Sequence, residues 1–198
     1  MTKARTNADN ASADIQGVTA GTGLSGGGTS GTVTLNVDTA VVATTSNTLT
    51  MTSKTLTSPT ITGGTLQNTV LRGLEEDVNV VASAATGTIN FDVETASVWY
   101  YTSNASANHT LNFRYNSSTT LNSALAVGDA ITLVWMNTNG ATAYYPNVIQ
   151  IDGSTVTPKV PAAISAGNAS SIDAYVFTII KTAATPTYTV LETQTKFA

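Results

Sequence analysis

From about residue 78 onward, hydrophobic and polar positions alternate in short stretches, which is the pattern of strands with one buried face. Leu111, Phe113 and Tyr115 share one side of such a stretch, and Ile149 and Ile151 share one side of another. The predicted strands are Thr88–Val93, Ser97–Thr102, His109–Tyr115, Ala130–Met136, Ala141–Tyr145, Asn147–Ile151, Ser171–Lys181 and Thr187–Glu192. About eight short strands predict a β-sandwich or jelly-roll-like domain over residues 78–198.

Turn signals separate several of these strands. Asn139-Gly140 and Asp152-Gly153 are dipeptides that favour two-residue hairpin turns. The stretch Thr120–Ala126 predicts one helical turn, with Leu121 and Leu125 on one side. Strands and turns with a single short helix make the expected fold class all-β.

Residues 16–77 have a different pattern, in which large apolar residues are few and lie isolated among threonine and glycine. In a lone chain they have nothing to pack against, whereas three copies wound about a three-fold axis supply the missing partners. We therefore expect a fibre-like β segment that forms an intertwined trimer, although a flexible linker has a similar composition. The candidate trimer-core residues are Val33, Leu35, Val37, Leu49, Leu56, Ile61 and Leu66.

The first 15 residues form a polar arm without hydrophobic periodicity. Such a segment cannot bury enough apolar surface to order itself, so we expect it to become ordered on another protein. The candidate docking residues, which include one from the start of the next segment, are Lys3, Arg5, Ile15 and Val18.

Composition excludes several classes of function. Charged residues make up only 10% of the chain, compared with about 25% in typical soluble domains. The net charge is −4 and the basic residues are scattered, so we expect no nucleic-acid partner. No apolar run approaches the roughly 20 residues that a membrane span needs, and no secretory signal is apparent. Assembly in a cytoplasm without membrane insertion is the expectation.

Candidate chemistry is sparse. His109 is the single histidine, cysteine is absent, and the sequence predicts His109 to be a polar surface residue. The acidic run Glu75-Glu76-Asp77 lacks the spacing of a glycosidase carboxylate pair or a calcium loop. It is interpreted as a solvated junction or a salt bridge to a neighbouring subunit. We predict no enzyme activity and no catalytic, cofactor or metal site.

Two aromatic clusters are candidates for recognition. Neighbouring residues of a strand point to opposite faces, so Trp99 and Tyr101 are expected in the core. Tyr100, Tyr144 and Tyr145 are the candidate exposed aromatics, either in a subunit interface or stacked on a sugar ring of a host cell-surface glycan.

Several stretches resemble segments of fibre-type proteins from tailed bacteriophages. They are the run Gly17–Val37, the unit Lys54–Ile61, and the C-terminal stretches Asn112–Asp129 and Thr138–Thr182. The last two are similar to a terminal module of virion appendage proteins in phages of marine bacteria, including cyanophages.

This resemblance implies a homotrimer located in the virion, bound through its N-terminus to another phage tail or capsid protein. It implies a non-enzymatic short tail fibre or tail appendage whose C-terminal domain adheres to the host surface. A capsid decoration protein, or head fibre, is the alternative, because 198 residues are few for a long tail fibre.

Overall fold

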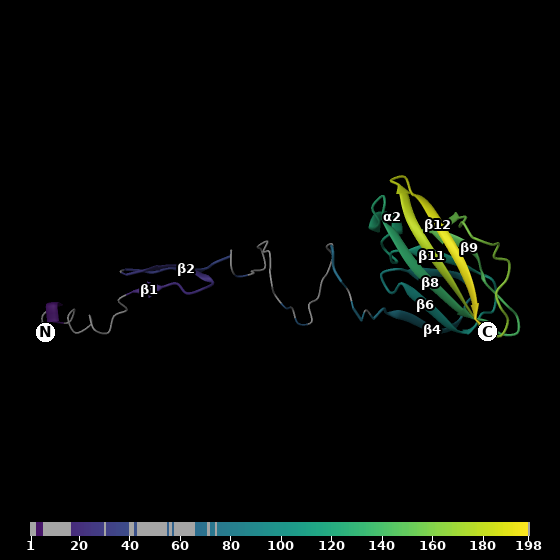
Figure 1. The fold of residues 1–198 in the computed structure, drawn as a ribbon, viewed down its shortest axis with the longest axis horizontal. Helices are drawn as coiled ribbons and strands as arrows, with labels where there is room; N and C mark the ends of the chain where they lie inside the picture. Colours follow the sequence, from purple (N-terminus) through teal and green to yellow (C-terminus); the bar gives the residue numbers. More distant parts are fainter. Residues whose placement is uncertain are drawn as a thin grey trace. The chain divides into compact units, whose positions relative to one another are not determined.

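The fold is described from a computed structural model, in which residues 3–5, 17–29, 31–39, 42, 55, 57, 66–70, 72–73 and 75–197 can be described (Figure 1). The chain divides into two compact units, Met1–Asn68 and Thr69–Ala198. Both are built from strands, so the all-β fold class is confirmed. The finer division into residues 1–15, 16–77 and 78–198 stays a prediction.

The described strands of the N-terminal unit form a small antiparallel sheet in the order β1-β2-β3. They are β1 (Val18–Thr19), β2 (Leu24–Gly28) and β3 (Leu35–Val37). Glycine is required inside β2, because a Cβ on Gly26 would lie 2.3 Å from the carbonyl oxygen of Thr34, and Gly26 has a φ of +104°. The glycine-rich run is therefore a strand in close contact with its neighbour.

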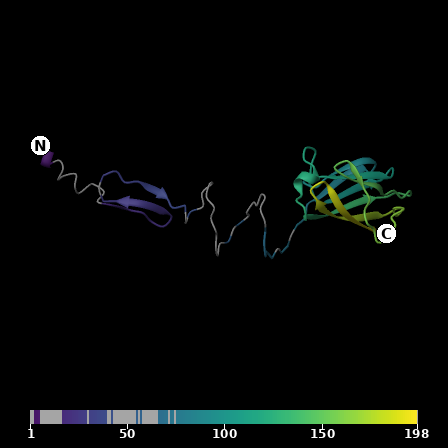
Figure 2. The same ribbon diagram turned by 90° about the horizontal axis from the view of Figure 1, so that it is seen from above.

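The C-terminal unit contains two sheets (Figures 1 and 2). The five-stranded sheet has the order β12-β11-β8-β6-β4, with β4 at Val78–Ala84, β6 at Val98–Asn104, β8 at Ala130–Thr138, β11 at Ile172–Ala183 and β12 at Thr187–Phe197. The four-stranded sheet has the order β10-β9-β7-β5, with β5 at Gly87–Asp92, β7 at His109–Arg114, β9 at Pro146–Ile151 and β10 at Ser154–Val156.

The chain passes back and forth between the two sheets from β4 to β9. Each strand of this series lies parallel to the strand two positions earlier, so β4, β6 and β8 are parallel in one sheet and β5, β7 and β9 in the other. The antiparallel pairs described in this unit all involve its last three strands, with β9 beside β10, β8 beside β11, and β11 beside β12. The two-sheet sandwich is therefore present, but the jelly-roll connectivity is not confirmed, because jelly-roll strands run antiparallel.

The parallel pairing places side chains of the same type next to each other in the core. Phe91 lies beside Phe113 in register, Trp99 beside Trp135, and the rings of Phe91 and Trp99 are 4.9 Å apart. Burying each large side chain contributes about 1.5–3 kcal/mol to stability. The predicted inward positions are confirmed, and the residues concerned are Leu111, Phe113, Ile149 and Ile151.

Two turn predictions have opposite outcomes. Asp152 and Gly153 have φ of +49° and +80° and join β9 to β10 as a two-residue hairpin, as predicted. Asn139-Gly140 makes no hairpin, because the backbone N–H of Asn139 donates to the carbonyl oxygen of Ser171 at 2.8 Å. The chain then crosses to the other sheet.

The predicted strand Ala141–Tyr145 is a loop, so that prediction was wrong. Its backbone is held by side chains instead, with the N–H of Tyr144 donating to Asn139 Oδ1 at 3.0 Å. The predicted helical turn is present as α2 (Leu121–Ala124), capped by Thr120 Oγ1, which accepts from the N–H of Ser123 at 3.1 Å. Strands β4 and β10 were not predicted.

Candidate functional site

The predicted docking residues are partly described. Lys3 and Arg5 are exposed and helical, and Val18 is half-buried in β1. Ile15 lies outside the described residues. Docking through this arm stays a prediction.

The described trimer-core candidates are mostly exposed apolar side chains. Leu35 is 43% exposed, Val37 is 50% exposed and Leu66 is 57% exposed, whereas Val33 is half-buried. Leu24 of β2 pairs directly with Val37, so these two side chains share one face of the small sheet with Leu35. We call Leu24, Leu35 and Val37 the fibre patch. Leu49, Leu56 and Ile61 lie outside the described residues.

The candidate aromatics lie in two places. Tyr100 is half-buried in β6, and its hydroxyl accepts from Thr138 Oγ1 at 3.5 Å. Tyr144 and Tyr145 are half-buried in the loop before β9 and pack against the core. The other two aromatics are inside as predicted, with Trp99 buried and Tyr101 against the ring of Trp135 at 4.6 Å.

His109 is buried, with 1% exposure, so the prediction of a surface histidine was wrong. Its ring packs 5.4 Å from that of Trp135, and its Nδ1 lies 3.3 Å from the carbonyl oxygen of Ala107. Burial lowers the pKa of His109 to about 4, so the imidazole is neutral at pH 7. A neutral ring with an aromatic neighbour behaves as a core side chain.

The acidic run Glu75-Glu76-Asp77 is exposed, in agreement with a solvated junction. Glu76 accepts a hydrogen bond from the Ser97 hydroxyl, which ties the start of the domain to β6.

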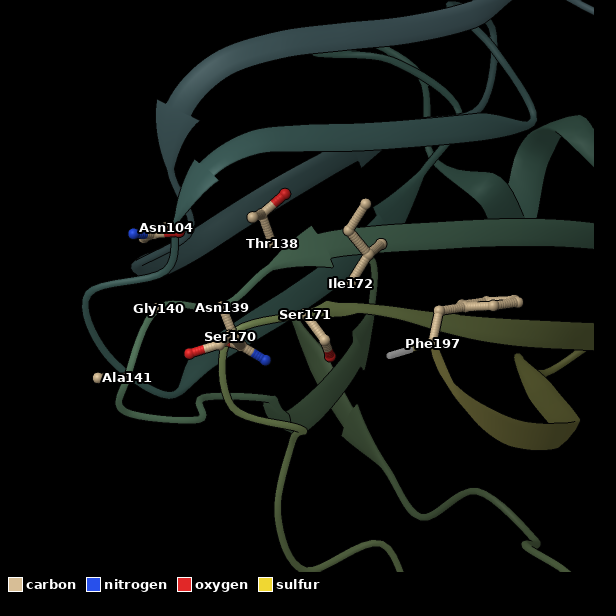
Figure 3. A pocket seen from close by; sticks show the side chains of 9 residues that line it. All are labelled: Asn104, Thr138, Asn139, Gly140, Ala141, Ser170, Ser171, Ile172 and Phe197. Atoms are coloured by element: carbon tan, nitrogen blue, oxygen red, sulfur yellow. The ribbon is translucent and has the colours of Figure 1, made fainter.

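A hollow of about 630 Å³ lies at the end of the five-stranded sheet, where β6, β8 and β12 end and β11 begins (Figure 3). We call it the end hollow. Figure 3 shows the amide of Asn104 and the ring of Phe197 at opposite ends of it. Its lining residues are Asn104, Thr138, Asn139, Gly140, Ala141, Ser170, Ser171, Ile172 and Phe197.

The lining of the end hollow is neutral. Amides and hydroxyls supply hydrogen-bond donors and acceptors, and the exposed ring of Phe197 supplies an apolar contact. None of the lining side chains carries a charge. Such a lining suits a neutral ligand rich in hydroxyl groups, and it offers no acid or base for turnover.

A buried polar network holds the floor of the end hollow. Asp173 is fully buried, and its Oδ2 accepts from the Asn139 amide at 3.1 Å and from the N–H of Asn168 at 2.7 Å. Burial raises the pKa of Asp173, while the Asn168 hydrogen bond opposes that shift. Only glycine fits at position 167, since a Cβ there would lie 2.4 Å from the carbonyl oxygen of Tyr144. Sequence reasoning missed this network, because it joins residues from distant parts of the chain.

Glu192 is a second buried acid, with 5% exposure, and burial raises its pKa to about 7. It lines a separate pocket of about 430 Å³ together with Tyr145, Pro146 and Ile164. Its Oε1 has no hydrogen-bond partner among the described residues. An unpaired carboxyl in this position is costly to ionise.

Within the described part of the chain, no cluster of three or more histidine, aspartate or glutamate side chains could hold a metal ion. The same residues include no helix with the length and apolar character of a membrane span. No family model matches the chain, and no curated protein or solved structure shows significant similarity to it.

Proposed function

We propose that this chain is a non-enzymatic structural protein of a phage particle, a short trimeric tail fibre or tail appendage. The observation that carries the proposal is the fibre patch, since Leu24, Leu35 and Val37 are each at least 41% exposed in a single chain. Apolar side chains gathered on one face of a three-stranded sheet are stabilised when that face is covered. Three identical chains about one axis cover each patch with its own copies.

The end hollow supports a role in host-surface adhesion. Its neutral amide and hydroxyl groups and the ring of Phe197 fit a carbohydrate better than a charged ligand. Each such contact is weak, but three copies that bind at the same time give the particle a much higher overall avidity than one copy has. The likeness of Gly17–Val37 and Lys54–Ile61 to phage fibre segments supports the virion as the location.

The mass of the purified full chain in solution, measured by light scattering, tests this proposal. We expect three times the chain mass of 20.3 kDa for the wild type and a lower mass for Leu35→Ser/Val37→Ser, which removes two residues of the fibre patch. Asn36→Ser is the matched control, because Asn36 lies between these residues on the opposite face of β3 and its loss should leave the mass unchanged.

A wild-type chain with the mass of one copy contradicts the trimeric fibre. A capsid decoration protein that assembles only on the phage head then becomes the better proposal. A trimer that survives the double substitution keeps the appendage but removes the fibre patch as its contact.

A further inference from the structure

The outer face of the five-stranded sheet is apolar over most of its width. Val98, Val134 and Val176 are in register on neighbouring strands, and Val78 extends the row to the edge strand β4. The residues that alternate with them, such as Trp135 and Phe177, are buried in the core, so the valine row points outward.

A second row lies beside the first. Val80, Tyr100 and Met136 are in register on β4, β6 and β8. Val80 is 62% exposed, and Leu191 on the opposite edge strand β12 is 43% exposed. The remaining outward positions of β8, β11 and β12 are mainly threonine, isoleucine and alanine, so no charged side chain interrupts the face between these two edges. We call it the valine face.

The four-stranded sheet of the same domain has a polar outer side. Asn90, Asn112 and Gln150 are in register along its outer side, and the Asn112 amide donates to Asn90 Oδ1 at 2.8 Å. Asp92 and Arg114 form an ion pair in the next row. Polar ladders of this kind are stable in water, whereas the polar side chains of the valine face are neutral threonines, such as Thr132 and Thr178 in register on β8 and β11.

We propose that the valine face packs against the valine faces of other copies of this chain in the trimer. A covering surface with charges would lose their hydration without gaining a partner, because the one charge beside the valine face among the described residues is Lys159, which pairs with Leu191 at its rim. An equally uncharged surface avoids that penalty, and this chain supplies one in every copy.

The size of the face determines how much it can contribute to the contact. Five strands spaced about 4.8 Å apart, over some six residues of about 3.3 Å each, make roughly 500 Å² per chain. Three chains then bury roughly 1,500 Å² in total, or roughly 500 Å² in each of the three pairwise contacts. That is less than the roughly 1,200 Å² of a specific, stable interface, so the trimer also needs the fibre patch as a second contact. A patch of roughly 500 Å² is as large as the largest apolar patch of a typical monomeric protein, and such patches are often binding surfaces. The number of three chains rests on the proposed function, whereas the apolar character of the valine face does not.

The absence of cysteine from the chain makes a direct test available. Single variants Val80→Cys and Leu191→Cys place a thiol at the two edges of the valine face, and Val127→Cys is the matched control in the loop after α2. Val127 is 56% exposed and Val80 is 62% exposed, so in a single chain their thiols react at similar rates with a maleimide. The mass of each full-length variant is measured by light scattering in the same sample.

We expect an oligomer in which the thiols at positions 80 and 191 react at least tenfold more slowly than the thiol at position 127. Equal rates at all three positions in an oligomer overturn the valine face as the contact and leave the proposed trimer standing. Protection at only one edge overturns a contact across the whole face. A single-chain mass with three fast thiols overturns both this inference and the trimer.

Discussion

At the scale of single residues, two of the buried ionisable side chains, His109 and Glu192, respond to pH in opposite ways. Burial lowers the pKa of His109 from 6.5 to about 4. Between these two pH values the imidazole is protonated in the unfolded chain and neutral in the folded chain. Stability contributed by the neutral imidazole is complete above pH 6.5 and is lost as the pH falls toward 4. Burial raises the pKa of Glu192 from 4.5 to about 7, so the stability of its protonated form is complete below pH 4.5 and is lost as the pH rises through 7.

Glu192→Gln should therefore stabilise the protein at pH 8 and change it little at pH 5. Glutamine keeps the shape and removes the ionised carboxylate, whose burial costs up to about 3 kcal/mol for a shift of this size. Thermal unfolding at the two pH values measures the effect, and a rise of up to about 10 °C, confined to pH 8, is expected. Glu75→Gln, at an exposed position, serves as control and should behave the same at both. An equal effect of Glu192→Gln at both values would show that its carboxyl does not titrate in this range.

At the scale of elements, one side chain joins a hairpin to a helix. The carboxylate of Asp152, in the turn between β9 and β10, accepts from the N–H groups of Leu121 at 2.7 Å and Asn122 at 3.0 Å. These are first-turn donors of α2 that have no partner within the helix. The hairpin turn and the helix therefore depend on each other.

Asp152→Asn should lower the free energy of unfolding by about 1–2 kcal/mol, because an amide offers one neutral oxygen where the carboxylate offers two charged ones. Asparagine tolerates the positive φ of this position, so the turn itself is retained. Urea unfolding of the variant measures the loss, with the exposed Asp77→Asn as control. No change in the midpoint would mean that water replaces the carboxylate at the start of α2 without loss.

The sequence was informative where a structural element depends on neighbours in the chain. The alternation of Leu111 with Phe113 identifies an inward face, and Asp152-Gly153 identifies a hairpin, since both signals are local. It failed where a residue is paired across the fold. His109 resembles a surface residue beside Asn108 and Thr110, but its environment comes from Trp135 on another strand.

Local sequence patterns also did not predict the connectivity between strands. Trp99 and Trp135 are neighbours on parallel strands, although a whole strand of the other sheet and the helix α2 separate them in sequence. Hairpin signals identify only antiparallel pairs. Parallel strands are joined by long crossover connections, so no short sequence motif indicates that β6 and β8 are neighbours. The polar network around Asp173 was missed for the same reason.

At the scale of the whole molecule, the end hollow predicts binding of neutral carbohydrate. Phe197→Ala should weaken binding to a panel of neutral oligosaccharides about tenfold, because the exposed ring supplies the apolar contact of the hollow. Phe197→Tyr keeps the ring and should bind as the wild type does. An array of immobilised sugars read with the full chain measures both variants. Equal binding by all three proteins would place recognition elsewhere on the molecule.

The passage of the chain between two sheets also governs the order in which the domain becomes complete during synthesis. In the five-stranded sheet, β11 and β12 are the only partners joined directly by a short turn, and they are the last strands to be made. Every other pair in that sheet must close a long loop before it gains a contact, which makes it slow to form. The strands of the five-stranded sheet therefore leave the ribosome unpaired, and its one hairpin is complete only after β4, β6 and β8 have been made.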